Sequence, residues 1–482
     1  MIEPNVLLGP VRRLGRLLRE RRIRSIELTE AYLHRLETIG PRLNAVVTLT
    51  RELALEQARE ADKELAAGEY RGPLHGVPYG VKDLLATKGI PTTWGAEPYR
   101  TQVFDYDATV VERLREAGAV LVAKLAMVEL AGGMGYTHPD ASFTGPGRTP
   151  WNIDHWSGGS SSGSAAAVAA GLVGFAIGSE TSGSILTPCA FCGVSGLRPT
   201  YGLVSRHGAM ALCWTLDKLG PIARTADDCG LVLAAIAGVD PNDPTTDGEF
   251  AYPLRGQQAG AARRFRIGVV QHATERAQPE VKANFERSLE ALRGFADLEL
   301  DVPFPDLPWG PAVSTIVDAE GAAAFRDLIE SGGTRKLRAA SDRIGGYAGM
   351  MTLAVDYIDA LRARVRMRAE LDALLSRYDA LVAPTRGGVA PRADRDMRST
   401  PTPSASPSPA PQPERPSPPA TIPAGNLAGV PAVCVPNGFG ESGLPTSLQL
   451  IGRAFSEPTL LAIADRYQQA TDWHLQHPPG VV

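Results

Sequence analysis

Two runs of small residues and one lysine carry side chains suited to nucleophilic chemistry. The first run, residues 157–164, holds five serines and three glycines and leads into an alanine-rich stretch. The second, residues 178–185, is a glycine- and serine-rich turn that contains Ser184. A serine on a tight turn, next to consecutive backbone N–H groups, has the ingredients of a nucleophile with an oxyanion hole. Either turn taken alone is more typical of a structural role.

Three interpretations compete for the first run. Glycine-rich loops before helices bind phosphate, but the chain has no Gly-Lys dipeptide and so lacks the P-loop pattern. A flexible linker does not fit between Trp151, Trp156 and an alanine-rich helix that must pack closely. The third interpretation is a catalytic loop, in which glycines permit strained backbone angles and hydroxyls are placed tightly.

A serine nucleophile needs a base, and the chain offers histidine or lysine. Lys82 lies in the apolar segment 76–85, where burial could lower its pKa by up to ~3–5 units and leave a neutral amine. Pairing of Lys82 with Asp83 at the surface is equally compatible with the sequence. The nearby histidines belong to no recognisable motif; they are His75, His138, His155 and His207.

Composition narrows the functional classes for this chain of 482 residues. Its 49 basic and 53 acidic residues give a net charge of −4, which excludes binding of nucleic acid or an anionic membrane through a large positive field. Five cysteines form an odd, sparse set that favours a reducing compartment. We see no signal peptide and no apolar run of the ~20 residues that a membrane helix needs. A cytoplasmic protein is expected.

Helical and strand patterns alternate along the chain, and most strands read as continuous apolar runs. This predicts an α/β fold with a central, buried, parallel or mixed sheet. Residues 401–420 hold nine prolines and four serines and predict an extended loop. Helices are expected at 25–40, 43–67, 107–117, 164–170, 280–294 and 355–378, and strands at 119–124, 174–178, 265–270 and 380–383. Residues 74–83 predict a strand or loop.

Six stretches together resemble the amidase signature family of serine hydrolases. They agree with the family in order and spacing, and the resemblance is most specific over 74–233 and 426–466. The stretches are 74–96 (LHGVPYGVKDLLATKGIPTTWGA), 107–130, 149–185 (including WSGGSSSGSAAA and GSETSGSI), 191–209, 216–233 and 426–452.

The resemblance implies one large domain over residues 1–482, with a central mixed sheet flanked by helices on both faces. It divides the chain into N-terminal helices (1–70), a catalytic core (71–240), a variable substrate-side region (241–390), a Pro-rich loop (391–420) and a C-terminal core segment (421–482). The sequence leaves open whether that loop gates the site.

The resemblance also implies a Lys–Ser–Ser triad. Lys82 matches the base, Ser160 the bridging serine that family members hold through a cis peptide bond, and Ser184 the nucleophile. The matching oxyanion hole is formed by backbone N–H groups of Thr181, Ser182, Gly183 and Ser184. No metal or organic cofactor is expected, and Cys189-x-x-Cys192 lacks the second pair that a zinc site would need.

Two departures from the family pattern bear on the substrate. Glu180-Thr181-Ser182 replaces a common Asp-x-Gly, and Leu186 replaces a common arginine after the nucleophile, which favours neutral substrates. We expect apolar pocket walls at Met134, Phe143 and Trp214.

Three functions remain in competition. The first is hydrolysis of a neutral amide, carbamate (urethane), aryl acylamide or ester by a monomer or homodimer, with a small-molecule substrate and with neither nucleic acid nor membrane as a partner. The second is the A subunit of a glutamine-dependent tRNA amidotransferase, the family branch that releases ammonia from glutamine inside a complex. The third is a non-catalytic binding protein on the same fold.

Overall fold

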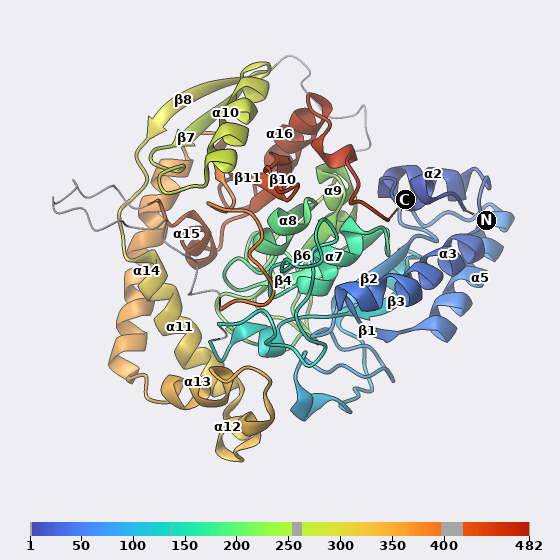
Figure 1. Cartoon of the computed structure of the whole chain (residues 1–482), viewed down its shortest axis with the longest axis horizontal. Coiled ribbons are helices and arrows are strands. Elements are labelled where there is room, and N and C mark those ends of the chain that lie inside the picture. The colour runs from blue at the N-terminus through green and yellow to red at the C-terminus, as the bar shows by residue number, and fades with distance from the viewer. Residues whose placement is uncertain (1, 136, 253–262, 397–417, 482) are drawn as a thin grey trace.

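An eleven-stranded mixed sheet forms the centre of the molecule, with helices packed on either side of it (Figure 1). The computed structural model describes residues 2–135, 137–252, 263–396 and 418–481. The strand order is β1-β3-β2-β4-β6-β5-β10-β11-β9-β7-β8. This confirms the predicted α/β fold. Most of the predicted Pro-rich loop, residues 397–417, lies outside the described residues.

The strands differ in direction along the sheet. β2 pairs in parallel with β3 and β4, and β7 pairs in parallel with β8 and β9; the other neighbours are antiparallel. The strands are β1 Val46–Leu49, β2 Pro78–Lys82, β3 Val120–Leu125, β4 Phe175–Glu180, β5 Ser195–Arg198, β6 Lys218–Ala223, β7 Phe265–Val270, β8 Ala296–Val302, β9 Ala380–Pro384, β10 Ala432–Phe439 and β11 Pro445–Ile451.

Helices connect and cover these strands. None of the helices within the described ranges has the length and apolar character needed to cross a bilayer. They are α1 Pro4–Leu7, α2 Val11–Arg19, α3 Ser25–Thr38, α4 Gly40–Leu43, α5 Arg51–Ala67, α6 Thr109–Glu116, α7 Ser162–Ala169, α8 Leu186–Cys192, α9 Ala226–Ile236, α10 Pro279–Arg293, α11 Trp309–Ala324, α12 Arg326–Glu330, α13 Asp342–Gly349, α14 Ala354–Leu375, α15 Thr421–Ala428 and α16 Glu457–Gln469.

One predicted helix contains a strand. The sequence pattern predicts a single helix over 43–67, within a region expected to be helical, but β1 occupies its start and α5 begins only at Arg51. β1 pairs with the edge of β3. The β-branched run Val46-Val47-Thr48 suits a pleated strand better than a helix, and this local preference outweighs the apolar spacing.

The parallel pairing of β2 with β4 brings the carboxyl ends of both strands to one edge of the sheet. Lys82 ends β2 and Glu180 ends β4, while Val81 is aligned with Ile177 between them. Helix α7 packs on both strands, and every residue in it is buried. Its Gly163 lies so close to the backbone of Ala126 that an added Cβ would come within 2.5 Å of the Ala126 nitrogen. Small residues are therefore required here.

A buried carboxylate fixes the turn that follows β4. Glu180 Oε2 accepts hydrogen bonds from the backbone N–H groups of Ile185 (2.8 Å) and Leu186 (3.0 Å). Its Oε1 accepts from Arg198 Nη1 (3.1 Å) and Asn426 Nδ2 (2.7 Å). Both charged side chains have no exposed surface. The Arg198 charge and these hydrogen bonds hold the pKa of Glu180 below its ordinary value, against the opposing effect of burial.

We predict that Glu180→Ala lowers the free energy of unfolding by about 3–5 kcal/mol, because it leaves the Arg198 cation buried without its partner. Glu97→Ala removes half of an exposed ion pair with Arg100 and serves as the control, with a loss of less than about 1 kcal/mol. Urea titration followed by circular dichroism measures both. Equal losses for the two variants would contradict the structural role of Glu180.

Candidate active site

Lys82 lies at the end of β2 with no exposed surface, and its amine faces hydroxyl groups. Lys82 Nζ is 2.7 Å from Ser160 Oγ and 2.9 Å from Ser179 Oγ. Burial lowers the pKa of Lys82 to about 7, although the negative charges of Asp217 and Glu180 oppose that effect. Near neutral pH a substantial share of this amine is therefore uncharged and able to accept a proton.

The alternative partner of Lys82, Asp83, is engaged elsewhere. Its carboxylate lies 3.2 Å from Lys124 Nζ in a fully buried ion pair and accepts from Thr93 N (3.0 Å). Lys124 also donates to the Leu85 carbonyl (2.8 Å). The interpretation of Lys82 and Asp83 as a surface pair is therefore wrong. The two side chains do not meet because successive side chains in extended backbone point to opposite sides.

The serine- and glycine-rich run is anchored to the sheet edge by its hydroxyl groups. Ser161 Oγ donates to the Ser179 carbonyl (3.2 Å), and Ser164 Oγ donates to the Ile177 carbonyl (3.2 Å). The peptide bond between Gly159 and Ser160 is cis. With every residue from Ser157 to Ser164 buried, this segment is a fixed loop and neither a flexible linker nor an open phosphate cradle.

Ser184 lies on the turn between β4 and α8, next to that loop. The Ser161 N–H donates to the Ser184 carbonyl (3.3 Å), which ties the two turns together. Ser184 is 9% exposed, and its Oγ makes no hydrogen bond to any residue that the structure describes. A hydroxyl with a free lone pair, close to the surface and beside a lysine–serine pair, is suited to attack a carbonyl carbon.

The backbone of the same turn offers hydrogen-bond donors. Gly183 has a φ of +91°, a conformation that glycine adopts without strain. Within the described residues, the N–H groups of Ser182, Gly183 and Ser184 have no acceptor. The Thr181 hydroxyl donates to Asp217 Oδ1 (2.6 Å), which anchors the start of the turn. Such unpaired and fixed donors can stabilise an oxyanion. The side chain of Ser182 is exposed.

A cavity with an apolar lining opens beside these groups. It is narrow, with a volume of about 30 Å³, and includes Ser179 and Thr181 in its wall. Trp214, one of the expected pocket residues, lines it and is 57% exposed. The remaining wall comes from Leu84, Ala131, Arg206, Ala209, Met210, Ala211, Leu212, Asp217 and Leu219.

The other two expected pocket residues lie outside this wall. Met134 is buried and packs against Gly345 and Gly346 of α13. The guanidinium of Arg100 stacks over the ring of Phe143, with Arg100 Cζ 4.4 Å from the centroid of that ring.

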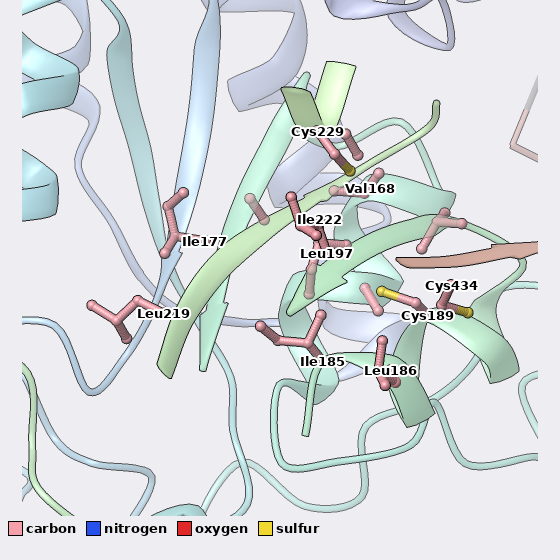
Figure 2. Packing of buried hydrophobic residues seen from close by; sticks show 14 of the residues in the cluster. Val168, Ile177, Ile185, Leu186, Cys189, Leu197, Leu219, Ile222, Cys229 and Cys434 are labelled. Atoms are coloured by element: carbon pink, nitrogen blue, oxygen red, sulfur yellow. The ribbon is translucent and has the colours of Figure 1, made fainter. Parts of the chain in front are cut away.

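Leu186, which stands where the family commonly has an arginine, has no exposed surface and belongs to the core cluster around Ile185 and Cys189 (Figure 2).

Sequence reasoning missed Ser179 and Asp217. Ser179 is the second hydroxyl near the Lys82 amine, and the available signal was a serine that follows the apolar start of strand β4. Asp217 joins Thr181 to the pocket wall, because its Oδ2 accepts from the N–H groups of Leu212 (2.8 Å) and Cys213 (2.9 Å). No local pattern links residue 217 to residue 181; only the antiparallel pairing of β4 with β6 brings them together.

The cysteine pair Cys189-x-x-Cys192 is part of the core. Both are buried free thiols, and burial raises the pKa of each. Cys192 Sγ donates to the Ser157 carbonyl (3.4 Å). Across the described ranges, no group of three or more potential metal ligands occurs.

Comparisons of this chain with family models, curated sequences and solved structures all indicate the same family. The family model described as Amidase matches residues 27–461. A curated relative from Moorella thermoacetica, named as the A subunit of glutamyl-tRNA(Gln) amidotransferase, is 37% identical over 96% of this chain and 97% of its own length. The structure of the native peptide amidase from Stenotrophomonas maltophilia is 33% identical, has a TM-score of 0.82 and is matched over 98% of both chains. The structure of the A subunit of glutamyl-tRNA(Gln) amidotransferase from Thermotoga maritima is 28% identical, has a TM-score of 0.77 and is matched over 97% of this chain and 96% of its own.

These relatives correct one expectation. We expected a monomer or homodimer with a small-molecule substrate and no nucleic acid partner, and this is wrong, because relatives of nearly full length are named as one subunit of a glutamyl-tRNA(Gln) amidotransferase. The net charge of −4 excluded only direct binding through a positive field. It carries no information about a surface that another subunit covers.

The family model spans most of the chain, and relatives of more than 30% identity match almost all of it. The chain therefore belongs to the amidase family that its signature motifs resemble.

Proposed function

We propose that this protein hydrolyses a carboxamide through an acyl-enzyme on Ser184 and releases ammonia, as the A-type subunit of a glutamine-dependent amidotransferase. The observation that carries the chemistry is the buried Lys82 amine, 2.7 Å from Ser160 Oγ, beside the turn that presents Ser184. The amidotransferase names of several nearly full-length relatives favour glutamine as the amide donor.

The reaction uses the three side chains in sequence. Ser184 Oγ attacks the carbonyl carbon, its proton passes to Ser160, and the Ser160 proton passes to neutral Lys82. The oxyanion accepts hydrogen bonds from the backbone N–H groups of the 181–184 turn. Collapse of the tetrahedral intermediate breaks the C–N bond while the proton returns through Ser160 to the leaving nitrogen. Water then cleaves the Ser184 ester by the same route.

A second candidate is hydrolysis of a neutral amide, carbamate or ester with an apolar group. The specific observation in its favour is the apolar cavity beside Ser179 and Thr181, with Leu84, Leu212 and Trp214 in its wall. Burying an apolar group there would contribute about 25 cal/mol per Å² of apolar surface removed from water. A non-catalytic binding role has no specific observation in its support.

We predict that a fluorophosphonate probe labels Ser184 and that labelling is lost in Ser184→Ala. Lys82→Ala should reduce the labelling rate and the release of ammonia from glutamine by about 10²–10⁴-fold, because the base is removed. Lys218→Met, which removes another buried lysine, is the matched control and should keep most of the labelling. Adduct mapping by mass spectrometry gives the readout. Labelling that persists unchanged in Lys82→Ala would contradict the mechanism.

The pH dependence follows from the same lysine. Only the uncharged amine accepts a proton, so kcat/KM should rise with pH, reach half of its maximum near pH 7 and become level about one pH unit higher. Asp217→Asn removes a negative charge that favours the ammonium, so the rising limb should move to lower pH. A rise of kcat/KM with its midpoint near the ordinary lysine pKa of about 10.4 would contradict this role of Lys82. So would a shift of that midpoint to higher pH in Asp217→Asn.

The two candidate substrates can be separated at Trp214. If the apolar cavity binds substrate, Trp214→Ala should lower kcat/KM for phenylacetamide by about tenfold and leave hydrolysis of glutamine nearly unchanged. Phe455→Ala removes an aromatic ring of similar exposure, 46% against 57%, away from the cavity and serves as the control. Ammonia release measures both substrates. An equal loss in the two variants would argue against use of the cavity.

A further inference from the structure

The part of the pocket wall that carries Trp214 has no regular secondary structure of its own. Residues 211–217 belong to the connection between β5 and β6 and form neither helix nor strand. Leu212, Trp214 and Asp217 of this segment line the cavity. Trp214 is 57% exposed, so burial does not fix its ring. Contacts from other parts of the chain therefore decide where the ring lies. We call residues 211–217 the wall loop.

One carboxylate of α11 holds the two residues that flank Trp214. Glu320 Oε2 accepts from Cys213 Sγ (3.3 Å) and from Thr215 N (2.9 Å), and its Oε1 accepts from Thr215 Oγ1 (2.8 Å). Tyr357 of α14 donates to the same Oε1 (2.9 Å). Hydrogen bonds to a carboxylate are roughly twice as strong as those between neutral groups. Glu320 thus clamps the wall loop on both sides of the tryptophan.

Further contacts hold the backbone carbonyl groups of the wall loop. The Trp214 carbonyl accepts from Tyr201 Oη (3.1 Å) and from Arg206 Nη1. The guanidinium of Arg206 also lies over the Trp214 ring, with Cζ 5.0 Å from the ring centroid. The Thr215 carbonyl accepts from Arg364 Nη2 of α14 (3.0 Å). Together with the Glu320 clamp, these contacts hold an exposed tryptophan in place.

We propose that Glu320 is a specificity-determining residue that acts through Trp214, because it positions this ring as a fixed wall for the apolar group of an amide substrate. The cavity is narrow, about 30 Å³, so the position of the ring decides what can enter. A wall that is ordered before binding adds no ordering cost when the substrate arrives, whereas a loosened side chain must be immobilised at that step. The inference rests on the proposed function, since it concerns the second candidate substrate class.

The same contacts give the region 241–390 a way to influence the substrate. The sequence predicted this region to lie on the substrate side, but none of the described residues in the cavity wall comes from it. Glu320, Tyr357 and Arg364 belong to this region and hold the wall loop or its clamp. Residues outside the cavity therefore shape it, and a change at Glu320 should alter substrate choice without touching the reacting groups.

The first test compares Glu320→Ala with Glu330→Ala, which shortens an exposed glutamate of α12. In Glu320→Ala, KM for phenylacetamide should rise about three- to tenfold with little change in kcat. Hydrolysis of glutamine and labelling of Ser184 should stay within about twofold. Glu320→Gln should restore most of the wild-type KM, because an amide oxygen can accept from Thr215 N and an amide nitrogen can donate to the neighbouring hydroxyls. Glu330→Ala should match the wild type.

A double-mutant cycle shows whether Glu320 acts through Trp214. When Glu320→Ala is added to Trp214→Ala, kcat/KM for phenylacetamide should change less than about twofold, because the positioned side chain is already absent. A further loss as large as in the wild-type background would overturn the proposal. So would equal losses for glutamine and phenylacetamide in Glu320→Ala, which would assign Glu320 to general stability.

Fluorine NMR tests the position of the ring without any turnover. The chain has six tryptophans, so labelling with 5-fluorotryptophan gives few signals, and the Trp214 signal is assigned by its loss in Trp214→Phe. In Glu320→Ala the Trp214 signal should shift and sharpen as the ring gains mobility, while the other signals stay in place and show an intact fold. Phenylacetamide should shift the Trp214 signal of the wild type.

An unmoved Trp214 signal in Glu320→Ala, or one that does not respond to phenylacetamide in the wild type, would contradict the proposal. If Glu320→Ala does not fold, Thr215→Val carries the same test, because it deletes only the Oγ1 contact with Glu320. If Ser184 is labelled in neither the wild type nor any variant, the proposed function fails, while the fluorine spectra still decide whether Glu320 positions Trp214.

Discussion

The rest of the site depends on one constraint: an amine held away from water, with hydroxyl groups rather than a carboxylate as its described hydrogen-bond partners. Two buried cations near the site, Lys124 and Arg198, are paired with Asp83 and Glu180 at 3.2 and 3.1 Å. Lys82 faces Ser160 and Ser179 instead. Burial lowers the pKa of Lys82 to about 7 against the opposing charges of Asp217 and Glu180, and its neutral hydroxyl partners add no further charge that would hold the proton in place. The surrounding fold maintains this difference.

Small side chains make the constraint possible. Helix α7 packs on β2, β3 and β4 because it presents serine, glycine and alanine, and an added Cβ at Gly163 would meet the Ala126 backbone. The serine hydroxyls that do not face Lys82 satisfy backbone groups of the sheet edge, as Ser161 and Ser164 do with β4. Close packing and these hydrogen bonds thus exclude water from the lysine and hold the nucleophile turn beside it.

Much of this arrangement could be predicted from the chain alone. The apolar strand runs and the signature motifs predicted the α/β class, and the resemblance pointed to Lys82, Ser160 and Ser184, which the fold gathers at one sheet edge. The ion pair between Asp83 and Lys124 could not be predicted, because the partners are distant in sequence and meet through strand pairing. The helix expected over 43–67 contains β1, since apolar spacing was weighed above the β-branched run. Met134 and Phe143 were expected in the pocket wall only because they are apolar. An apolar side chain on a loop can face either the cavity or the interior, and the sequence does not decide between the two.

The titration of Lys82 itself tests the central claim most directly. The chain has only seven lysines, so side-chain carbon signals of isotopically labelled lysine can be followed by NMR against pH. The Lys82 signal is identified by its loss in Lys82→Arg, and the Lys218 signal in the same way by Lys218→Arg. We expect the Lys82 signal to titrate near pH 7. Titration near pH ~10, as for a lysine in water, would contradict it.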